Sequence, residues 1–85
     1  MPMEILWEKR AIRKLIKIPQ HDRSNIVVAV RSLVSFPNCR NVKVLKNHMY
    51  DYRLRVGRYR VFFDVEDTLH VLKIEEVKKR DESTY

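Results

Sequence analysis

Four arginines fall within eight residues in the stretch YDYRLRVGRYRVFF, which covers residues 50–63. They are Arg53, Arg55, Arg58 and Arg60, set among tyrosines and aliphatic side chains. A guanidinium group stays protonated in proteins and binds a phosphate group through two parallel N–H donors. Arginines at this spacing therefore suggest chemistry on a phosphate-bearing anion, in which fixed positive charge stabilises negative charge on oxygen.

The alternation of apolar and basic residues in this stretch predicts a β-hairpin with a two-residue turn at 57–58, where a glycine can adopt a positive φ. That turn sets Arg55 opposite Arg60 and Arg53 opposite Phe62, and opposite residues share one face of a sheet. The other face is apolar or aromatic throughout, so it is expected to pack under the helices. Its members are Tyr52, Leu54, Val56, Tyr59, Val61, Phe63 and Val65.

The opposed arginines require an explanation, because like charges directly opposite each other in a sheet repel. Arginine stems that cover apolar sheet, or ion pairs with nearby acids, would be ordinary structural explanations. An anion held between the guanidinium groups of Arg55 and Arg60 explains the pairing better. If the next turn also has two residues, Lys73 lies beside Arg60, and His70 lies on the core face.

The rest of the chain predicts an α+β domain with the order β-α-α-β-β-β, in which an N-terminal αα-hairpin packs on one face of an antiparallel sheet. Asp22 is the expected N-cap of the second helix, and a proline ends each helix. The apolar faces at helical spacing are Ala11, Ile12, Leu15 and Ile16 in the first helix and Ile26, Val30, Leu33 and Val34 in the second. The predicted helices are 8–18 and 22–36, the predicted strands are 3–7, 50–56, 59–65 and 68–77, and 42–45 is either loop or a short extended piece.

The composition indicates a strongly basic single domain, 1–85, because 18 lysines and arginines outweigh 11 acids to give a net charge of +7. Such a charge favours nucleic acid, acidic lipid or an acidic protein segment as partner. No apolar run is long enough for a signal peptide or a membrane span, so a cytoplasmic protein is expected. Cys39 is interpreted as a loop thiol, and no His/Cys cluster has zinc spacing. No metal or other cofactor is predicted, and His48 is retained as a candidate for proton transfer.

The end of the last predicted strand is also basic, since EEVKKRDESTY contains Lys78, Lys79 and Arg80 and finishes with Tyr85. A basic run near a chain end is often only a solvated tail. Here the strand order is expected to bring the run back beside Arg60. Aromatic side chains combined with arginines are typical of sites for single-stranded RNA, where a ring stacks on a base.

Taken together, these residues resemble the RelE/ParE superfamily of bacterial toxin–antitoxin toxins. The resemblance covers nearly the whole chain: the element order at this size, YRLRVGRYRVFFDV in the central hairpin, and VKKRDESTY at the end of the last strand. It implies a RelE-like fold and one of two activities. RelE-like toxins enter the ribosomal A site and cut mRNA, whereas ParE-like toxins poison DNA gyrase.

The RelE-like arm uses basic residues on the central strands and an arginine and a tyrosine near the C-terminus, and all the matching positions are filled here. The resemblance therefore implies a metal-independent, ribosome-dependent endoribonuclease that inhibits translation, in which an RNA 2′-hydroxyl attacks the adjacent phosphorus. The implied catalytic residues are Arg55, Arg60, Arg80 and Tyr85. The implied RNA-binding residues are Arg53, Lys43, Lys46, Lys73, Lys78 and Lys79.

One departure from RelE concerns the general base. RelE has lysines at the positions of Arg53 and Arg55, and one of them is assigned as the base, a role that arginine cannot take because it does not lose its proton. The candidates here are Lys46, Lys79, His48, Glu75 and Glu76. In addition, Tyr85 follows Arg80 one residue sooner than the corresponding tyrosine does in RelE.

The resemblance also implies partners: a cognate antitoxin, acidic and with a DNA-binding region, and the ribosome with its mRNA. Neither a membrane nor a small-molecule cofactor is implied. Two other functions remain open. One is a ParE-like gyrase inhibitor, and the other is a non-catalytic basic module whose binding to nucleic acid depends strongly on salt.

Overall fold

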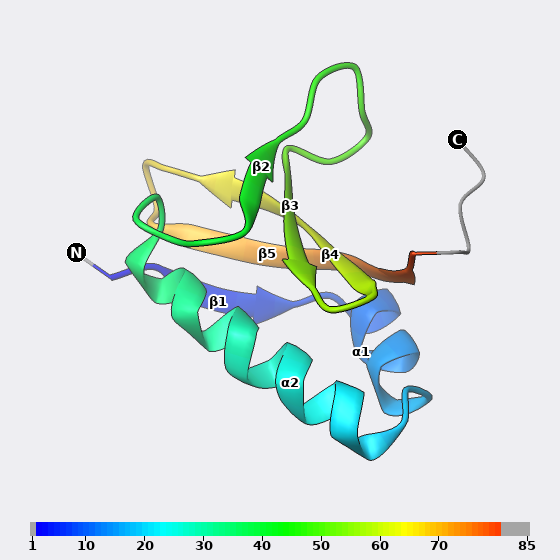
Figure 1. Ribbon diagram of the computed structural model, residues 1–85. Helices are drawn as coiled ribbons and strands as arrows, with labels where there is room; N and C mark the ends of the chain where they lie inside the picture. The colour runs from blue at the N-terminus through cyan, green and yellow to red at the C-terminus, as the bar shows by residue number, and fades with distance from the viewer. Residues whose placement is uncertain (1, 81–85) are drawn as a thin grey trace.

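The computed structural model describes residues 2–80, which form a five-stranded sheet and two helices (Figure 1). The longer helix runs along one face of the sheet, and the shorter helix packs against the last strand. In chain order the elements are β1 (Glu4–Trp7), α1 (Lys9–Ile16), α2 (Gln20–Arg31), the 3₁₀ turn η1 (Ser32–Ser35), β2 (Val42–Val44), β3 (Tyr52–Val56), β4 (Tyr59–Glu66) and β5 (Val71–Lys79). The α+β class is confirmed, and the predicted order β-α-α-β-β-β is found with one strand more, because 42–45 contains the short strand β2.

The strands lie in the order β1-β5-β4-β3-β2, so the first strand sits beside the last. Three of the four pairings are antiparallel, but β1 runs parallel to β5. The sheet is therefore mostly antiparallel rather than antiparallel throughout. Alternation in a sequence shows which residues share a face, but it does not show the direction of a neighbouring strand.

The core lies between α2 and the apolar face of the sheet. Its largest fully buried side chains come from both layers: Ile26, Val30, Leu33, Leu54, Val61, Phe63, Leu72, Ile74 and Val77. The apolar face that the sequence predicts for the hairpin is thus the face that packs under the helix. This packing fixes the opposite face of the same strands as the outer face of the sheet.

Parts of the predicted helix faces are not buried. Ile12 and Ile16 are 43% and 64% exposed, and only Ala11 of the predicted α1 face is fully buried. Val34 is 41% exposed because the chain tightens into the 3₁₀ turn after Arg31, and a 3₁₀ turn has three residues per turn instead of 3.6. The α-helical face that ends at Val30 is therefore not continued.

The N-cap prediction for the second helix is wrong. Pro19 occupies the N-cap position, and α2 begins at Gln20. Asp22 lies inside the first turn, where a negative charge interacts favourably with the helix dipole but caps no N–H group with its side chain.

The register of the β3–β4 hairpin agrees with the sequence prediction in every pair. Arg55 faces Arg60, Arg53 faces Phe62, and Val56 faces Tyr59 across the turn. Gly57 has a φ of 57°, in the left-handed region that the turn was expected to need. The opposed arginines are therefore a feature of the folded chain.

The β4–β5 register differs from the prediction. The connection at 67–70 has four residues, and an irregularity follows between Phe62 and Phe63, so the partner of Arg60 is Lys78 instead of Lys73. Lys73 lies opposite Asp64, and its Nζ is 3.7 Å from Oε2 of Glu8. The same loop leaves His70 exposed with a φ of 54°, not packed in the core.

Within residues 2–80, no helix has the length and apolar character to cross a membrane.

Candidate nucleic-acid interface

Two rows of residues run across the outer face of the sheet, on the side away from α2. The strand registers align them: the first row is Lys43, Arg53, Phe62 and Glu76, and the second is Arg55, Arg60 and Lys78. Residues aligned across neighbouring strands have their Cβ atoms about 4.5–5.5 Å apart, so the basic side chains lie close together. The outer face is therefore cationic where the inner face is apolar.

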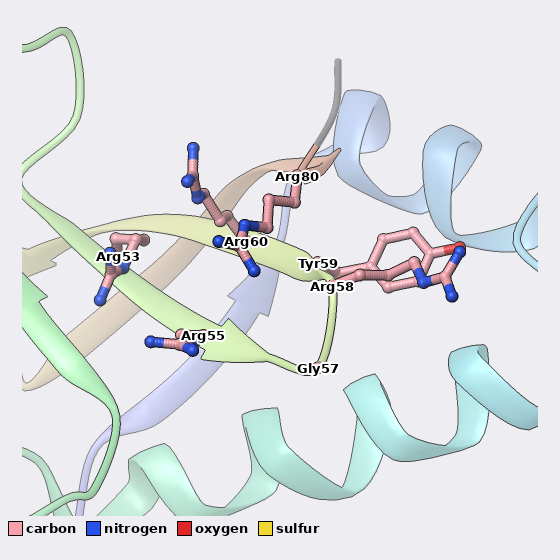
Figure 2. A pocket seen from close by; sticks show the side chains of 7 residues that line it. All are labelled: Arg53, Arg55, Gly57, Arg58, Tyr59, Arg60 and Arg80. Carbon is pink, nitrogen blue, oxygen red and sulfur yellow. The ribbon is translucent and has the colours of Figure 1, made fainter. Parts of the chain in front are cut away.

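A cavity of about 80 Å³ lies at the turn end of this face. It is lined by Arg53, Arg55, Gly57, Arg58, Tyr59, Arg60 and Arg80. Figure 2 shows the side chains of Arg58 and Tyr59 extending together, away from the other four arginines. We call those four, Arg53, Arg55, Arg60 and Arg80, the arginine cluster. Arg58, in the turn, does not point into it.

The last described residue is tied to the hairpin by its backbone. The N–H of Arg80 donates to the carbonyl oxygen of Arg58 at 2.6 Å. Because β5 also pairs with β4 up to the turn, this bond fixes the backbone of Arg80 next to the Arg55–Arg60 pair. The predicted return of the basic run to Arg60 is confirmed for Lys78 and Arg80.

The charge at this cavity is of one sign. Among the described residues, no carboxylate lines the cavity, and Arg53 and Arg60 are half-buried while Arg55 and Arg80 are exposed. Guanidinium groups that line one cavity can bind one phosphate group through several charge-assisted hydrogen bonds. The arrangement therefore favours an anion, and partial burial strengthens that interaction by lowering the local dielectric.

The predicted lysines divide into three groups. Lys43 and Lys78 lie in the two aligned rows on the outer face, and Lys46 is exposed in the loop that follows β2. Lys79 is paired with the buried Tyr59, which places it on the α2 side of the sheet, and Lys73 is at the far end of β5. The structure thus brings neither of the last two into the cluster. Tyr85 lies outside the described residues.

A second, aromatic cluster on the outer face was missed by the sequence analysis. The loop 45–51 lies on the side of the sheet away from α2 (Figure 1), and Phe62 and Tyr50 are only 2% and 7% exposed. The His48 ring stacks on Phe62 with ring centres 5.2 Å apart and planes at 14°. The available signal was Phe62 itself, an apolar residue at a position that alternation assigns to the polar face.

The hydrogen bonding of His48 bears on its candidacy as a general base. The backbone N–H of Tyr50 donates to Nδ1 of His48 at 3.1 Å. Because an N–H can only donate, Nδ1 holds a lone pair, and the neutral ring carries its proton on Nε2. The lone pair of Nδ1 is thus engaged by the backbone, which disfavours His48 as the proton acceptor for a ligand.

The carboxyl group of Glu75 is held away from the arginine cluster. Its Oε1 atom lies 3.6 Å from Nη2 of Arg10, whose Nε also donates to the Glu75 carbonyl oxygen. Burial, followed by a hydrogen bond with the side chain of Asp64, raises the pKa of Glu75. This carboxyl belongs to a local network with α1 and does not face the cavity.

Two other groups have a raised pKa. Burial raises the pKa of the Tyr50 phenol, to which the charge of Glu76 adds, so Tyr50 remains a neutral packing residue. Burial also raises the pKa of the Cys39 thiol, which disfavours the reactive thiolate and agrees with its interpretation as a loop thiol. In residues 2–80 no group of three or more His, Cys, Asp or Glu side chains could hold a metal ion.

Solved structures with this fold are found among RelE toxins. A chain of the archaeal RelE–RelB complex from Pyrococcus horikoshii OT3 is 26% identical with a TM-score of 0.81, and the match covers 98% of this chain and 100% of that one. A chain of the RelBE2 toxin–antitoxin complex from Mycobacterium tuberculosis is 23% identical with a TM-score of 0.81, covering 94% and 100%. The isolated E. coli RelE toxin is 18% identical with a TM-score of 0.78, covering 98% of this chain and 88% of that one.

Comparisons of the sequence with protein families and with curated proteins find no match. The structural matches nevertheless span archaeal and bacterial RelE proteins at nearly full coverage, so the RelE-like fold predicted from the sequence is confirmed.

Proposed function

We propose that this chain, which shares its fold with RelE toxins, is the toxin of a toxin–antitoxin pair and cleaves mRNA in the ribosomal A site. One observation carries the proposal: Arg55 and Arg60 face each other across the hairpin, and the backbone bond to Arg58 fixes Arg80 beside them. A bound phosphate group would offset the repulsion of this arrangement. Such a toxin would act in the cytoplasm, where it inhibits translation.

The proposed reaction is attack by an RNA 2′-oxygen on the adjacent phosphorus. The 2′-hydroxyl gives up its proton to solvent, the bond from phosphorus to the 5′-oxygen breaks, and the 5′-oxygen takes up a proton. The products are a 2′,3′-cyclic phosphate and a 5′-hydroxyl group. Arg60 and Arg80 stabilise the charge that develops on the phosphoryl oxygens, and no metal ion is required for this role. The cluster acts through charge and position, because arginine does not accept a proton in this pH range.

The remaining basic residues of the face position the substrate in this proposal. Arg53, Lys43 and Lys78 lie in the same two rows and hold the RNA backbone on either side of the reacting phosphate. Lys46 extends the basic surface along the loop, and Tyr85 orients a base or the phosphate. The ribosome supplies the geometry of the message, so proximity contributes a large part of the rate.

The proposed partner is an antitoxin. RelE proteins of this fold have been solved in complex with RelB, from an archaeon and from E. coli among others. A chain of net charge +7 attracts an acidic segment, and a segment that covers the arginine cluster would block RNA at the same time. Inhibition by the antitoxin then follows from competition for one cationic surface.

The proposal is tested by translating a defined message with purified ribosomes and mapping the new 5′ ends. We expect the wild-type protein to cut the message only on the ribosome, and Arg60→Ala to slow cleavage by about 10²–10³-fold, as for the loss of one group that stabilises transition-state charge. Arg31→Ala is the matched control, because it removes the same charge from an exposed position on α2.

A message left intact by the wild-type protein on ribosomes would overturn the proposal, and so would full cleavage by Arg60→Ala. A parallel assay of DNA supercoiling identifies the ParE-like alternative, in which gyrase is blocked and translation continues. Circular dichroism of each variant confirms that the fold survives the substitution.

A further inference from the structure

A second cavity adjoins the arginine cluster on the outer face. It has a volume of about 290 Å³ and is lined by Leu45, His48, Arg53, Arg60 and Phe62. Two of these residues, Arg53 and Arg60, also line the cavity of the arginine cluster. The two cavities therefore share the side chains of Arg53 and Arg60 as a common wall. One side of that wall is cationic, and the other side is formed by an aliphatic side chain and two rings.

The apolar side of this second cavity is held in place by backbone hydrogen bonds. The N–H of Leu45 donates to the carbonyl oxygen of Asp51 at 2.9 Å, and the N–H of Asp51 donates to Oδ1 of Asp64 at 2.8 Å. The bond from Tyr50 to Nδ1 of His48 fixes the imidazole over Phe62. The loop 45–51 thus forms a preorganised wall, and a ligand need not order it on binding.

We propose that this cavity is a nucleobase subsite, which binds the base of a nucleotide whose phosphate group lies in the arginine cluster. A nucleotide combines a flat, largely apolar ring with an anionic phosphate a short distance away. Bases stack on aromatic side chains and on the planes of arginine guanidinium groups, and both kinds of surface are present here. The adjacency of an apolar cavity and a cationic cavity matches that chemistry.

His48 has a defined role in this subsite. Its ring extends the stacking surface beyond the buried Phe62, and its Nε2–H can donate to an acceptor on the edge of a base. The base would be fixed on one side of the Arg53–Arg60 wall and the phosphate on the other. This is a positioning role, because a held base limits rotation of the sugar whose 2′-oxygen must approach phosphorus in line.

The inference rests on the proposed function in one respect, that the ligand is RNA. It can be tested without the ribosome or cleavage, by measuring the binding of a short single-stranded RNA with 2′-O-methyl sugars, which cannot react. In a series of such RNAs one base at a time is removed, so every member keeps the same number of phosphates. We expect removal of the base at one position to weaken binding of the wild-type protein by about tenfold, within the range for base–aromatic stacking.

The protein variants distinguish the contribution of the base to binding from that of the phosphate groups. His48→Ala, at an exposed position, should bind the complete RNA about as weakly as the wild-type protein binds the RNA that lacks that one base, and should no longer distinguish the two. Arg60→Ala should weaken binding to every member of the series. Leu69→Ala, which truncates a side chain that is 70% exposed in the loop 67–70, should keep the wild-type dependence on position.

A second measurement does not depend on any protein variant. 2-Aminopurine placed at the sensitive position should lose fluorescence on binding, because stacking on an aromatic ring quenches it. The subsite is overturned if no single base matters, or if His48→Ala retains the same dependence on position. The outcomes for binding and for cleavage are independent. If the protein shows the positional effect but leaves messages intact on ribosomes, the subsite is supported and the proposed activity is contradicted.

Discussion

At the scale of single residues, Arg55 and Arg60 explain why a cationic site can be built on a stable sheet. Their side chains share the outer face, while their neighbours Leu54 and Val61 pair on the inner face and are almost fully buried. Burial of each such aliphatic side chain contributes about 1.5–3 kcal/mol, whereas a like-charged pair across two strands costs about 1 kcal/mol or less. The same alternation therefore supplies both the packing and the site.

A prediction at this scale concerns Glu75, whose pKa is raised above its ordinary value of 4.5. Between the unfolded and the folded pKa, the folded protein binds more protons, so the free energy of unfolding falls as pH rises through that range. Glu75→Gln removes this titration. Relative to the wild-type protein, the variant should therefore gain stability between pH 4 and pH 7, as measured by urea unfolding at both values.

The comparison needs a control for the general effect of removing an acid from this basic protein. Glu66→Gln, at an exposed position on β4, serves that purpose and should show a smaller change with pH. The contrary result is informative as well. If the wild-type protein gains stability over Glu75→Gln as pH rises, the ion pair with Arg10 outweighs burial and the contact with Asp64.

At the scale of elements, the β3–β4 turn positions the whole arginine cluster. A Cβ atom added to Gly57 would meet no atom within 4 Å, so a substitution there is opposed only by the positive φ. Gly57→Ala should lower the free energy of unfolding by about 1–2 kcal/mol, the cost of the left-handed conformation for a residue with a Cβ atom.

Gly57→Asn is the matched variant, because asparagine adopts this conformation more readily than alanine and should cost less. Urea denaturation of the three proteins gives the order of stability. Equal stability of the alanine variant and the wild-type protein would mean that the turn relaxes into another conformation. The backbone bond between Arg80 and Arg58 would then be expected to change too.

The elements also show where sequence reasoning succeeds and where it stops. The hairpin register followed from two visible signals, strict alternation and a glycine at the turn. The loops at 45–51 and 67–70 contain positive φ values at Asn47 and His70, which are not glycines, so a search for glycine does not reveal those turns. The second of these loops, together with the irregularity between Phe62 and Phe63, changed the partner of Arg60 from Lys73 to Lys78.

The same limit applies to the site. Arg53, Arg55, Arg60 and Arg80 could be predicted because they lie on paired strands or at a strand end, where position in the sequence determines position in space. The aromatic cavity could not, because its wall is a loop whose path depends on hydrogen bonds between residues far apart, such as Asp51 and Asp64. Alternation gave only the isolated Phe62 as a signal.

At the scale of the whole molecule, the net charge of +7 and the local arginine cluster make different contributions to binding. Diffuse charge raises the rate of encounter with any polyanion, and it is screened by salt at distances beyond about 8–10 Å. Fixed contacts between arginine and phosphate release counterions from the nucleic acid, and each one adds to the salt dependence of the affinity. The two contributions can therefore be separated by experiment.

The slope of log affinity against log salt concentration provides that separation for a short single-stranded RNA. Each phosphate contact contributes about 0.7 to the slope, so Arg55→Ala should reduce its magnitude by about 0.7. Arg31→Ala removes an equal charge from α2, on the other side of the sheet, and should leave the slope nearly unchanged. Equal reductions in both variants would show that the RNA responds to the overall charge of the protein. In that case the opposed arginines of the hairpin would hold no phosphate, and the non-catalytic basic module would be the better description.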